Sequence, residues 1–352
     1  GLPLANQAGQ QASPNICSDG EGGAYVIWRD GTSSSYGEVY GTHLSPQGAI
    51  AAGTGVPIVS FPSYRSNPSL NTAGGGDAVL IWNDDRNSDL DLYAQRISVS
   101  GNSLLTQWGE GGKLVCNAQN DQTSPRVAQF GGTHTIMTWE DSRNGYKEVY
   151  YQILDENGNS ILNPNGNVAC SGEWEIIKPR VKAKNSIAYI VWEDKRNGWF
   201  SDIFAQKINS SGNTEWDNGL AINTIDGTQA EPRLTTDDNS GVYIVWEDQR
   251  NSGSTGVDIY AQHIDASGNM TYNADGLLIC DAPELQFNPL VRNDGNGGAM
   301  VVWGDQRSGG SYGMYLQQIN SNGVTLEEDG KDSFFGSVKI NPNLFSFRFV
   351  RA

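Results

Sequence analysis

Cysteine, histidine and positive charge are scarce in this sequence. Its 352 residues include 4 cysteines and 3 histidines, and 23 lysines and arginines stand against 40 aspartates and glutamates. The resulting formal net charge of −17 disfavours nucleic acids and anionic membranes as partners, because both are themselves negatively charged. No apolar run approaches the ~20 residues of a membrane-spanning helix. We therefore expect no nucleic-acid partner and no membrane insertion.

The scarcity of histidine and cysteine also argues against most metal and nucleophile chemistry. The sequence has no Ser-His-Asp signature, no Cys-His pair, no phosphate-binding loop and no metal-ligand spacing among its cysteines. Asp89 and Asp91 lie in an acidic loop that offers oxygen ligands for a structural calcium ion, but their spacing does not match a dedicated calcium loop. We expect no cofactor and no metal.

One sequence motif occurs six times along the chain. It consists of two apolar residues, then Trp-x-Asp-x-Arg, a short polar loop, and finally acid-apolar-Tyr-x-Gln-x-apolar. The tryptophans are 54, 57, 53, 54 and 57 residues apart, and a proline precedes each at nearly constant distance. Repeats of this length that contain short strands are typical of radial or stacked arrays. The tryptophans are Trp28, Trp82, Trp139, Trp192, Trp246 and Trp303, and the prolines are Pro14, Pro68, Pro125, Pro179, Pro232 and Pro289.

Each repeat contains four strand-like runs separated by turn residues. In the fifth repeat these runs are Pro232–Thr236, Val242–Trp246, Asp258–Ile264 and Leu277–Cys280. The runs are rich in β-branched and aromatic residues, the turns are rich in Gly, Asn, Asp and Ser, and the chain has 43 glycines. The second run is apolar at nearly every position, so both of its faces should be buried. The sequence predicts an all-β, six-bladed β-propeller with four antiparallel strands in each blade.

The chain ends indicate how the ring closes. Gly1–Pro14 aligns without gaps on Gly219–Pro232, so the chain begins on an outer strand whose own inner strands are missing. Pairing of this N-terminal strand with the sixth repeat would close the ring and remove an exposed sheet edge. Ser337–Ile340 is an alternative source of the same strand. We expect a propeller over 1–340 and an extra strand or the start of a linker over 341–352.

The four cysteines do not form a disulfide framework in this interpretation. Cys116, Cys170 and Cys280 each lie four residues after a glycine at the end of the fourth strand of a different repeat. Equivalent positions in different blades should be much further apart than the ~5.5 Å between Cα atoms that a disulfide needs. We predict that all four, including Cys17, are small buried hydrophobic residues.

The repeat resembles a family of secreted bacterial β-propellers found in exported surface proteins of Bacteroidetes-type bacteria. The resemblance covers nearly the whole chain and rests on Trp192–Gly198, Asp202–Gln206 and the turn Asp19–Ala24. It implies a secreted or cell-surface location and does not imply a particular reaction. The first repeat departs from the pattern because it lacks the arginine, and the sixth has Gly313 where the acid is expected.

The repeated Asp-Arg-acid set is predicted to be structural. The two acids flank the loop between the second and third strands, and the planar fork of an arginine between them can hold a carboxylate at two points. A catalytic site occurs once, whereas this set recurs, so we interpret it as a hairpin lock. Its members are Asp84, Arg86, Asp91, Asp141, Arg143, Glu148, Asp194, Arg196, Asp202, Asp248, Arg250, Asp258, Asp305 and Arg307. The recurrent glutamines are likewise predicted to be internal hydrogen-bonding residues: Gln95, Gln152, Gln206, Gln262 and Gln317.

Function should lie where the repeats differ, and the irregular aromatic residues mark one such place. Trp174 lies in the connection that enters the fourth repeat, while Trp199 and Phe200 lie in its hairpin loop. Tyr146 in the preceding loop extends this group. Exposed aromatic rings suit stacking on sugars or contacts with a protein partner. The alternative is that Trp174 and Trp199 pack on each other to cover a loop. Tyr36, Tyr64 and Tyr312 extend the same aromatic rim.

A second irregular feature is a set of arginines. Arg126, Arg180 and Arg233 each follow the repeat proline in the third, fourth and fifth repeats. Because that strand is the innermost of a blade, the three side chains can converge near the channel mouth and bind a carboxylate or sulfate. The alternative is that they pair with surplus acids on adjacent blades.

The main functional hypothesis is a non-catalytic extracellular module that presents its loop face to a glycan or protein ligand, within a larger multi-domain or multi-protein surface assembly. One alternative is a glycan-active hydrolase or lyase that uses the arginines at the channel mouth. Another is a rigid structural spacer. No catalytic residue is assigned, since a glycosidase needs a placed pair of carboxylates and no spacing selects a pair. The candidate acids are Glu173, Glu175, Glu231 and Asp121.

Overall fold

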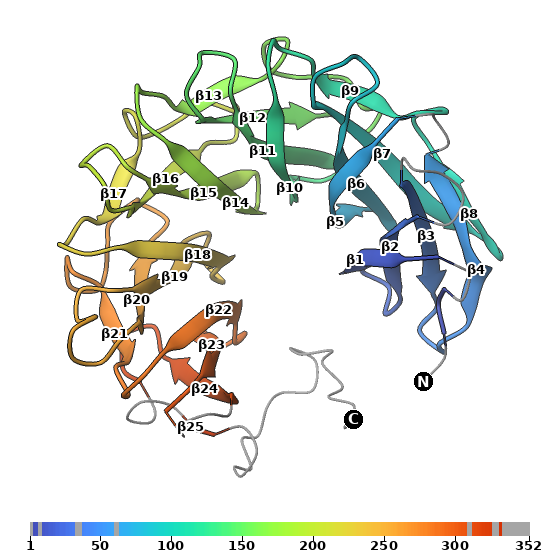
Figure 1. Cartoon of the computed structure of the whole chain (residues 1–352). Helices are drawn as coiled ribbons and strands as arrows, with labels where there is room; N and C mark the ends of the chain where they lie inside the picture. The colour runs from blue at the N-terminus through green and yellow to red at the C-terminus, as the bar shows by residue number, and fades with distance from the viewer. Residues whose placement is uncertain are drawn as a thin grey trace. The chain divides into compact units, whose positions relative to one another are not determined.

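The computed structural model describes residues 3–5, 9–31, 37–59, 63–307, 312–325 and 331–332. All regular structure in these residues is β-strand, and the strands form antiparallel sheets (Figure 1). Most sheets have four strands in sequence order, so each strand pairs with the one that follows it in the chain. This confirms the predicted all-β class and the four-stranded antiparallel unit.

The strands of the first three sheets all belong to the N-terminal part of the chain. The first sheet contains β1 Gln11–Ser18, β2 Ala24–Asp30, β3 Glu38–Leu44 and β4 Ile50–Val59. The second contains β5 Arg65–Gly74, β6 Asp77–Asp84, β7 Asp91–Ser100 and β8 Ser103–Thr106, with β9 Lys113–Cys116 as a fifth strand on β7. The third contains β10 Gln122–Phe130, β11 His134–Asp141, β12 Glu148–Leu154 and β13 Asn167–Cys170.

The remaining sheets repeat this order. The fourth contains β14 Ile176–Lys184, β15 Ile187–Asp194, β16 Asp202–Ile208 and β17 Leu220–Asn223. The fifth contains β18 Gln229–Thr236, β19 Val242–Asp248, β20 Asp258–Ile264 and β21 Leu277–Cys280. The sixth contains β22 Gln286–Asn293, β23 Ala299–Asp305, β24 Gly313–Ile319 and β25 Lys331–Asp332.

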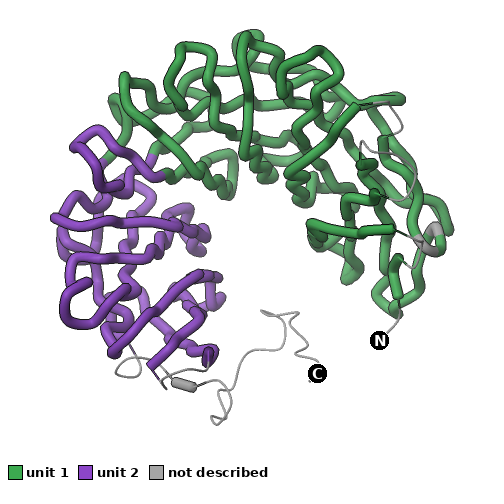
Figure 2. The backbone as a smooth tube through the Cα atoms, in the orientation of Figure 1, with its two compact units in different colours: residues 1–192, 206–220 green, residues 193–205, 221–352 purple. Residues whose placement is uncertain are grey.

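The chain divides into two compact units (Figure 2). The first consists of Gly1–Trp192 with Gln206–Leu220, and the second of Glu193–Ala205 with Ala221–Ala352. The boundary falls within the sequence of the fourth sheet. In the sixth sheet, β24 pairs with Lys331–Asp332, a strand that the sequence did not predict. Ser337–Ile340, the residues 341–352 and much of the N-terminal strand that was predicted to close the ring lie outside the described residues.

The strands of the fifth repeat follow the predicted pattern, with one difference at the first. Strand β18 begins at Gln229, three residues before Pro232, because the chain passes through a bulge and continues to pair upstream of the proline. Every residue of β19 except Glu247 is buried, which confirms that this strand is covered on both faces. Gln229 pairs with Asp248, and Asp248 pairs with Asp258, so the start of β18 and the β19–β20 loop share one end of the sheet.

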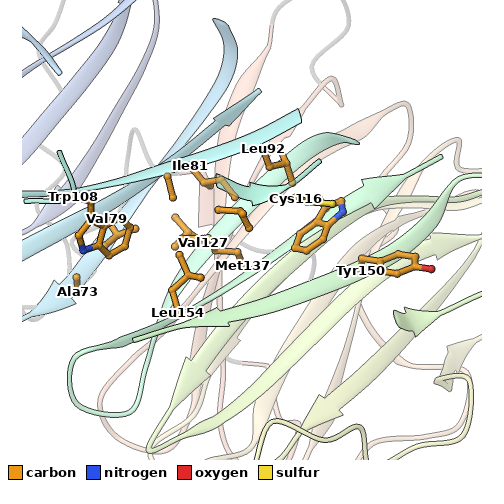
Figure 3. Packing of buried hydrophobic residues seen from close by; sticks show 13 residues of the cluster. Ala73, Val79, Ile81, Leu92, Trp108, Cys116, Val127, Met137, Tyr150 and Leu154 are labelled. Carbon is orange, nitrogen blue, oxygen red and sulfur yellow. The ribbon is translucent and has the colours of Figure 1, made fainter. Parts of the chain in front are cut away.

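The core of the first unit lies between neighbouring sheets. Figure 3 shows Val79 and Ile81 of β6 packed with Val127 of β10 and Met137 of β11. These side chains are almost completely buried, and burial of each contributes about 1.5–3 kcal/mol to folding. A blade of this kind cannot bury its apolar face alone, so the repeat has to be stacked against a neighbour.

Glycine four residues before the cysteine has a packing role in this core. Gly166 has a φ of +83°, and a Cβ atom built there would lie 2.5 Å from the ring of Trp139. The tryptophan edge therefore lies directly on the backbone at this position, and only glycine fits. Cys116, Cys170 and Cys280 are buried thiols, as predicted, whereas Cys17 is only partly buried because it lies on a first strand with an open face.

The Trp-x-Asp-x-Arg motif forms a compact polar lock at the end of each hairpin that carries it. In the third sheet the Trp139 indole donates to Asp141 Oδ2 at 2.8 Å, and Arg143 Nε donates to Oδ1 of the same carboxylate at 2.8 Å. The Arg143 guanidinium lies 3.9 Å above the ring of Tyr150, the tyrosine of the facing strand. Arg86, Arg196, Arg250 and Arg307 make the equivalent ion pair and the equivalent stack on Tyr93, Phe204, Tyr260 and Tyr315.

The second acid of the motif is held differently from the prediction. The arginine fork is directed to the first acid rather than placed between the two. The asparagine after the arginine holds the second acid: Asn87 donates to Asp91 at 2.6 Å and Asn144 to Glu148 at 2.7 Å. The physical reason is that the ring stack fixes the guanidinium plane over the tyrosine.

The recurrent glutamines have the internal role that was predicted. Gln95 is fully buried, its amide donates to the Gly109 carbonyl at 2.7 Å, and its Oε1 accepts from Trp108 N at 2.8 Å. Gln152, Gln206 and Gln262 make the same two kinds of contact in their sheets. His43 and His263 are also architectural, since each bonds a buried turn aspartate, Asp19 or Asp237, at 2.8 and 2.9 Å.

The two acids of one hairpin have pKa values displaced in opposite directions. Burial raises the pKa of Asp84, but hydrogen bonds from Arg86 and Trp82 outweigh it and the net shift is downward. For Asp91, burial and the nearby charge of Asp89 outweigh the bond from Asn87, and the pKa rises. Ionised Asp84 therefore stabilises the fold, and this contribution is lost as the pH falls through its folded pKa. Ionised Asp91 opposes folding at neutral pH, and that cost disappears as the pH falls through its raised pKa.

We expect Asp84→Asn to lower stability by about 1–3 kcal/mol at neutral pH, because a charged acceptor of buried donors is lost. Asp91→Asn should leave stability unchanged or raise it, since an amide oxygen still accepts from Asn87. Urea-unfolding midpoints measured at neutral pH and near ~pH 4 test both signs. The difference between the two variants should shrink at the lower pH. Equal losses for the two variants at neutral pH would contradict the assignment.

Candidate functional site

A strained backbone position recurs directly before the repeat proline. A non-glycine residue there adopts the left-handed conformation, with φ between 50° and 55°. In β1, β5, β10, β18 and β22 the strand register shifts at this place, which marks a β-bulge. Such conformations cost free energy and occur often at functional sites. The residues are Ser13, Asn67, Ser124, Lys178, Glu231 and Asn288.

In the first unit, residues next to these strained positions line a polar pocket. The pocket has a volume of about 330 Å³ and is open to solvent. It is lined by one stretch from each of four first strands, β1, β5, β10 and β14, which follow one another along the concave side of this unit (Figure 1). The lining residues are Ser13 and Asn15, Asn67, Pro68 and Ser69, Arg126, and Arg180. The volume lies in the range of small-molecule sites.

The charge of the pocket is divided between its two sides. The β1 and β5 side carries hydroxyl and amide groups only, and the β10 and β14 side carries the guanidinium groups of Arg126 and Arg180. Each guanidinium donates to the carbonyl of the proline before it, at 2.7 Å for Arg126 and 3.2 Å for Arg180. The bulge and this bond hold both arginines in the same way. Two half-buried arginines on adjacent strands form an anion-binding arrangement.

The third predicted arginine differs from these two. Arg233 also donates to its proline carbonyl, at 3.1 Å, but its Nη2 forms an ion pair with Glu231 at 3.1 Å. The residue before the proline is an acid only in this arginine-bearing strand, whereas Ser124 and Lys178 occupy that position before Arg126 and Arg180. Arg233 belongs to the second unit and does not line the pocket. The structure thus places Arg126 and Arg180 at one pocket and pairs Arg233 with Glu231 in the second unit.

The predicted aromatic residues differ in exposure and belong to different units. Trp199 is 97% exposed and Phe200 is 61% exposed, and both lie in the β15–β16 loop within the second unit. Tyr146, in the first unit, is 45% exposed. Trp174, also in the first unit, is partly buried, because its ring folds back over the backbone of Gly172. Tyr64 and Tyr312 are exposed, and Tyr36 lies outside the described residues.

The candidate acids have structural contacts and do not line the pocket. Asp121 Oδ1 accepts from Leu90 N at 3.1 Å, which ties the third sheet to a loop of the second. Glu231 is the ion-pair partner of Arg233, and Glu173 and Glu175 lie on the exposed connection before β14. The lining of the pocket therefore contains no carboxylate. In the described residues no group of three or more His, Cys, Asp and Glu side chains is placed to hold a metal ion.

The sequence pointed to the arginines but missed the uncharged half of the pocket. Ser13, Asn15, Asn67 and Ser69 flank the same repeat proline in the first two sheets, so the repeat register alone would have found them. The sequence alone does not mark them, because Asn and Ser next to proline are also ordinary turn residues.

Among the described residues, the structure has no helix that could cross a membrane.

Comparison with known proteins identifies the fold and no family. No family model matches the chain, and no curated protein matches it. Among solved structures, the polysaccharide lyase Uly1 is similar over 96% of this chain and 83% of its own, with a TM-score of 0.57 and 11% identity. A protein of unknown function from Dyadobacter fermentans DSM 18053 is similar over 88% of this chain and 94% of its own, with a TM-score of 0.50 and 10% identity. An α-L-arabinanase from Penicillium chrysogenum covers 76% of this chain and 83% of its own at 12% identity, with a TM-score of 0.46 that is too low to carry an argument.

These findings correct the main functional hypothesis. The interpretation as a non-catalytic binding module is contradicted, because a polysaccharide lyase matches almost the whole chain. The lack of a placed carboxylate pair in the sequence argues against glycoside hydrolysis and not against other kinds of glycan cleavage. At these identities the likeness establishes the shared all-β fold and not the activity.

Proposed function

We propose that this protein is a glycan-active enzyme that cleaves an anionic polysaccharide at the pocket between β1, β5, β10 and β14. The observation that carries the proposal is the pair of arginines, Arg126 and Arg180, that enters this pocket from adjacent strands beside uncharged sugar-binding groups. The similarity in fold to a polysaccharide lyase supports it. The acidic net charge of the chain makes a local cationic pocket stand out, because an anion is attracted to this pocket against the overall field.

The lining lacks the carboxyl pair of a hydrolase and fits the negative charge that develops in elimination. Hydrolysis of a glycosidic bond needs two placed carboxyl groups, and no carboxylate lines the pocket. In elimination from a uronic acid, a base takes the proton on C5, the electrons of that C–H bond form a C4=C5 double bond, and the bond between C4 and the glycosidic oxygen breaks. The residues that line the pocket include no side chain that is a base at neutral pH, so in this proposal water in the solvent-open pocket takes up the C5 proton and returns a proton to the departing oxygen. Negative charge develops on the sugar carboxylate in this step, and two bound guanidinium groups stabilise it.

The division of charge in the pocket indicates the kind of substrate. Ser13, Asn15, Asn67 and Ser69 offer donors and acceptors for hydroxyl groups, next to the arginine side. A chain in which an acidic sugar adjoins an uncharged sugar fits both sides at once. We therefore propose a uronate-containing polysaccharide as the substrate class.

The finer architecture belongs to the same proposal. We propose that the six sheets form a six-bladed β-propeller closed by the N-terminal strand, in a secreted or cell-surface protein of the Bacteroidetes-type propeller family. The recurrence of the hairpin lock in successive sheets supports the propeller. A polysaccharide is too large to enter a cell intact, so the proposed substrate class supports an extracellular location.

The test is incubation of the purified protein with a panel of uronate-containing, sulfated and neutral polysaccharides. The expected result is ultraviolet absorbance from unsaturated uronate ends, appearing together with new reducing ends, for one or more uronate polymers. New reducing ends without that absorbance would replace elimination by hydrolysis. Neither signal on any acidic polymer would overturn the proposal.

Trp199 and Phe200, which do not line the pocket, are proposed as additional contacts for the polymer. Because Trp199 is 97% exposed, we expect Trp199→Ala to change the free energy of unfolding by no more than about 0.5 kcal/mol. Loss of an aromatic stack should raise KM for long chains ~2- to 10-fold, with KM for short oligosaccharides unchanged. Urea unfolding and initial rates on polymers of two lengths measure this. An unchanged KM on long chains would remove Trp199 from the binding surface.

A further inference from the structure

The left-handed backbone position before Arg180 is anchored from the neighbouring sheet. Lys178 has a φ of 55° and lies at the strained position before Pro179, two residues ahead of Arg180. In the equivalent strands β10 and β18 the register shifts at this position, so an N–H there lies outside the normal strand ladder. The Lys178 N–H instead donates to Glu140 Oε1 at 2.8 Å. Glu140 lies on β11, so a side chain of the third sheet holds the backbone of the fourth at this point.

The other oxygen of Glu140 is fixed on its own sheet. Oε2 accepts from Lys147 Nζ at 2.8 Å and from Thr123 Oγ1 at 3.1 Å. The Glu140 side chain is only 5% exposed. Burial raises the pKa of Glu140, but the bonds from Lys147 and the Lys178 backbone outweigh it and the pKa is lowered, so this carboxylate stays charged at neutral pH. A charged acceptor with both oxygens occupied holds its partners more firmly than a neutral one.

We propose that Glu140 is a positioning residue for anion binding: it holds the left-handed bulge at Lys178 and so sets the direction in which Arg180 enters the pocket. This inference rests on the proposed function, since it concerns how the same pocket binds its anion. Glu140 does not line the pocket and is not assigned a catalytic role.

The repeat provides a matched control within the same chain. Glu247 occupies the position of Glu140 in the fifth repeat, and its Oε1 accepts from Asn288 N at 2.7 Å. Asn288 is the left-handed residue before Pro289, but the residue after that proline is Leu290. Glu247 therefore anchors an equivalent bulge that carries no arginine. Removal of either glutamate should disturb a bulge, and only removal of Glu140 should disturb a guanidinium of the pocket.

The first measurement is hydrogen exchange, which does not depend on activity. In Glu140→Ala the Lys178 amide should exchange faster while the Asn288 amide is unchanged, and in Glu247→Ala the reverse should hold. Glu140→Gln should protect Lys178 better than Glu140→Ala, because the amide oxygen can still accept. Unchanged exchange at Lys178 in Glu140→Ala would overturn the anchoring step whatever the enzyme does.

The second measurement is kinetic and uses the polysaccharide that the wild-type protein cleaves. We expect Glu140→Ala to raise KM ~10-fold, as for loss of one well-placed charged hydrogen bond, with a smaller change in kcat. Glu247→Ala should leave KM within ~2-fold. In an Arg180→Ala background, Glu140→Ala should add almost nothing, because its effect passes through Arg180. Equal effects of the two glutamates, or full additivity with Arg180→Ala, would overturn the proposal.

If the wild-type protein cleaves no polysaccharide, the proposed function fails, and the exchange experiment still decides whether Glu140 anchors the bulge. The dissociation constant of a uronate oligosaccharide, measured by titration calorimetry, then replaces KM as the readout. The variants are those of the kinetic experiment: Glu140→Ala, Glu247→Ala, Arg180→Ala and Glu140→Ala/Arg180→Ala. No binding by the wild-type protein would overturn the positioning role for an anion, even if the anchor is confirmed.

Discussion

The double variant Arg126→Ala/Arg180→Ala is expected to lose about 100- to 1,000-fold in kcat/KM on a uronate polysaccharide. A hydrogen bond to a charged group contributes about 1.5–3 kcal/mol, which corresponds to ~10- to 150-fold for each arginine. The two losses should not multiply fully, because both guanidinium groups would hold the same anion. Each single variant should therefore lose more activity in the wild-type background than in the background of the other variant.

The fold should tolerate both substitutions, since the arginines lie partly exposed at the edge of a solvent-open pocket. Arg233→Ala is the matched control, because Arg233 follows the same repeat proline and makes the same bond to its carbonyl. Its charge is offset by Glu231, so we expect less than ~3-fold change in kcat/KM. Initial rates at several substrate concentrations separate KM from kcat. A loss in Arg233→Ala equal to that in Arg180→Ala would show that the pocket is not the binding site.

The architecture of the blade was predictable because its signals are local and repeated. Stretches such as Val242–Trp246 are continuous runs of β-branched and aromatic residues, and their periodic recurrence leaves little room for another fold. The bulge at Glu231 was not predictable in the same way. A glutamate before proline is expected in an extended conformation, and its left-handed φ of 51° is imposed by the neighbouring sheet, where Glu193 accepts its N–H at 2.7 Å.

The candidate site was predictable in part, because the repeat marks equivalent positions in successive sheets. The position after the repeat proline marked Arg126 and Arg180, since an innermost strand places this position near the middle of the array. The sequence could not rank these against Arg233, because ion pairing of Arg233 with Glu231 depends on side-chain geometry across the bulge. The exposure of the tryptophans was also difficult to predict, because Trp174 and Trp199 are both tryptophans outside the repeated positions. The ring of Trp174 folds over its own backbone, whereas Trp199 is exposed to solvent.

The second large effect concerns the hairpin lock. Asp141→Ala is expected to lower the free energy of unfolding by about 3–5 kcal/mol, the usual result of removing one partner of a buried ion pair. Asp141 is fully buried and accepts from the indole of Trp139 and from both Nε and Nη2 of Arg143. Its removal leaves these donors without their acceptor inside the core.

A variant that removes both Asp141 and Arg143 separates two effects on stability, the unbalanced buried charge and the lost side-chain volume. Asp141→Ala/Arg143→Met should lose less stability than Asp141→Ala alone, because no buried charge is then left unbalanced and the methionine still covers the ring of Tyr150. Urea midpoints from near-ultraviolet circular dichroism measure all three proteins. If the lock were a solvated surface pair, Asp141→Ala would cost less than ~1 kcal/mol and the double variant would give no recovery. The lock recurs in successive sheets, so the same ordering should hold for Asp248 and Arg250.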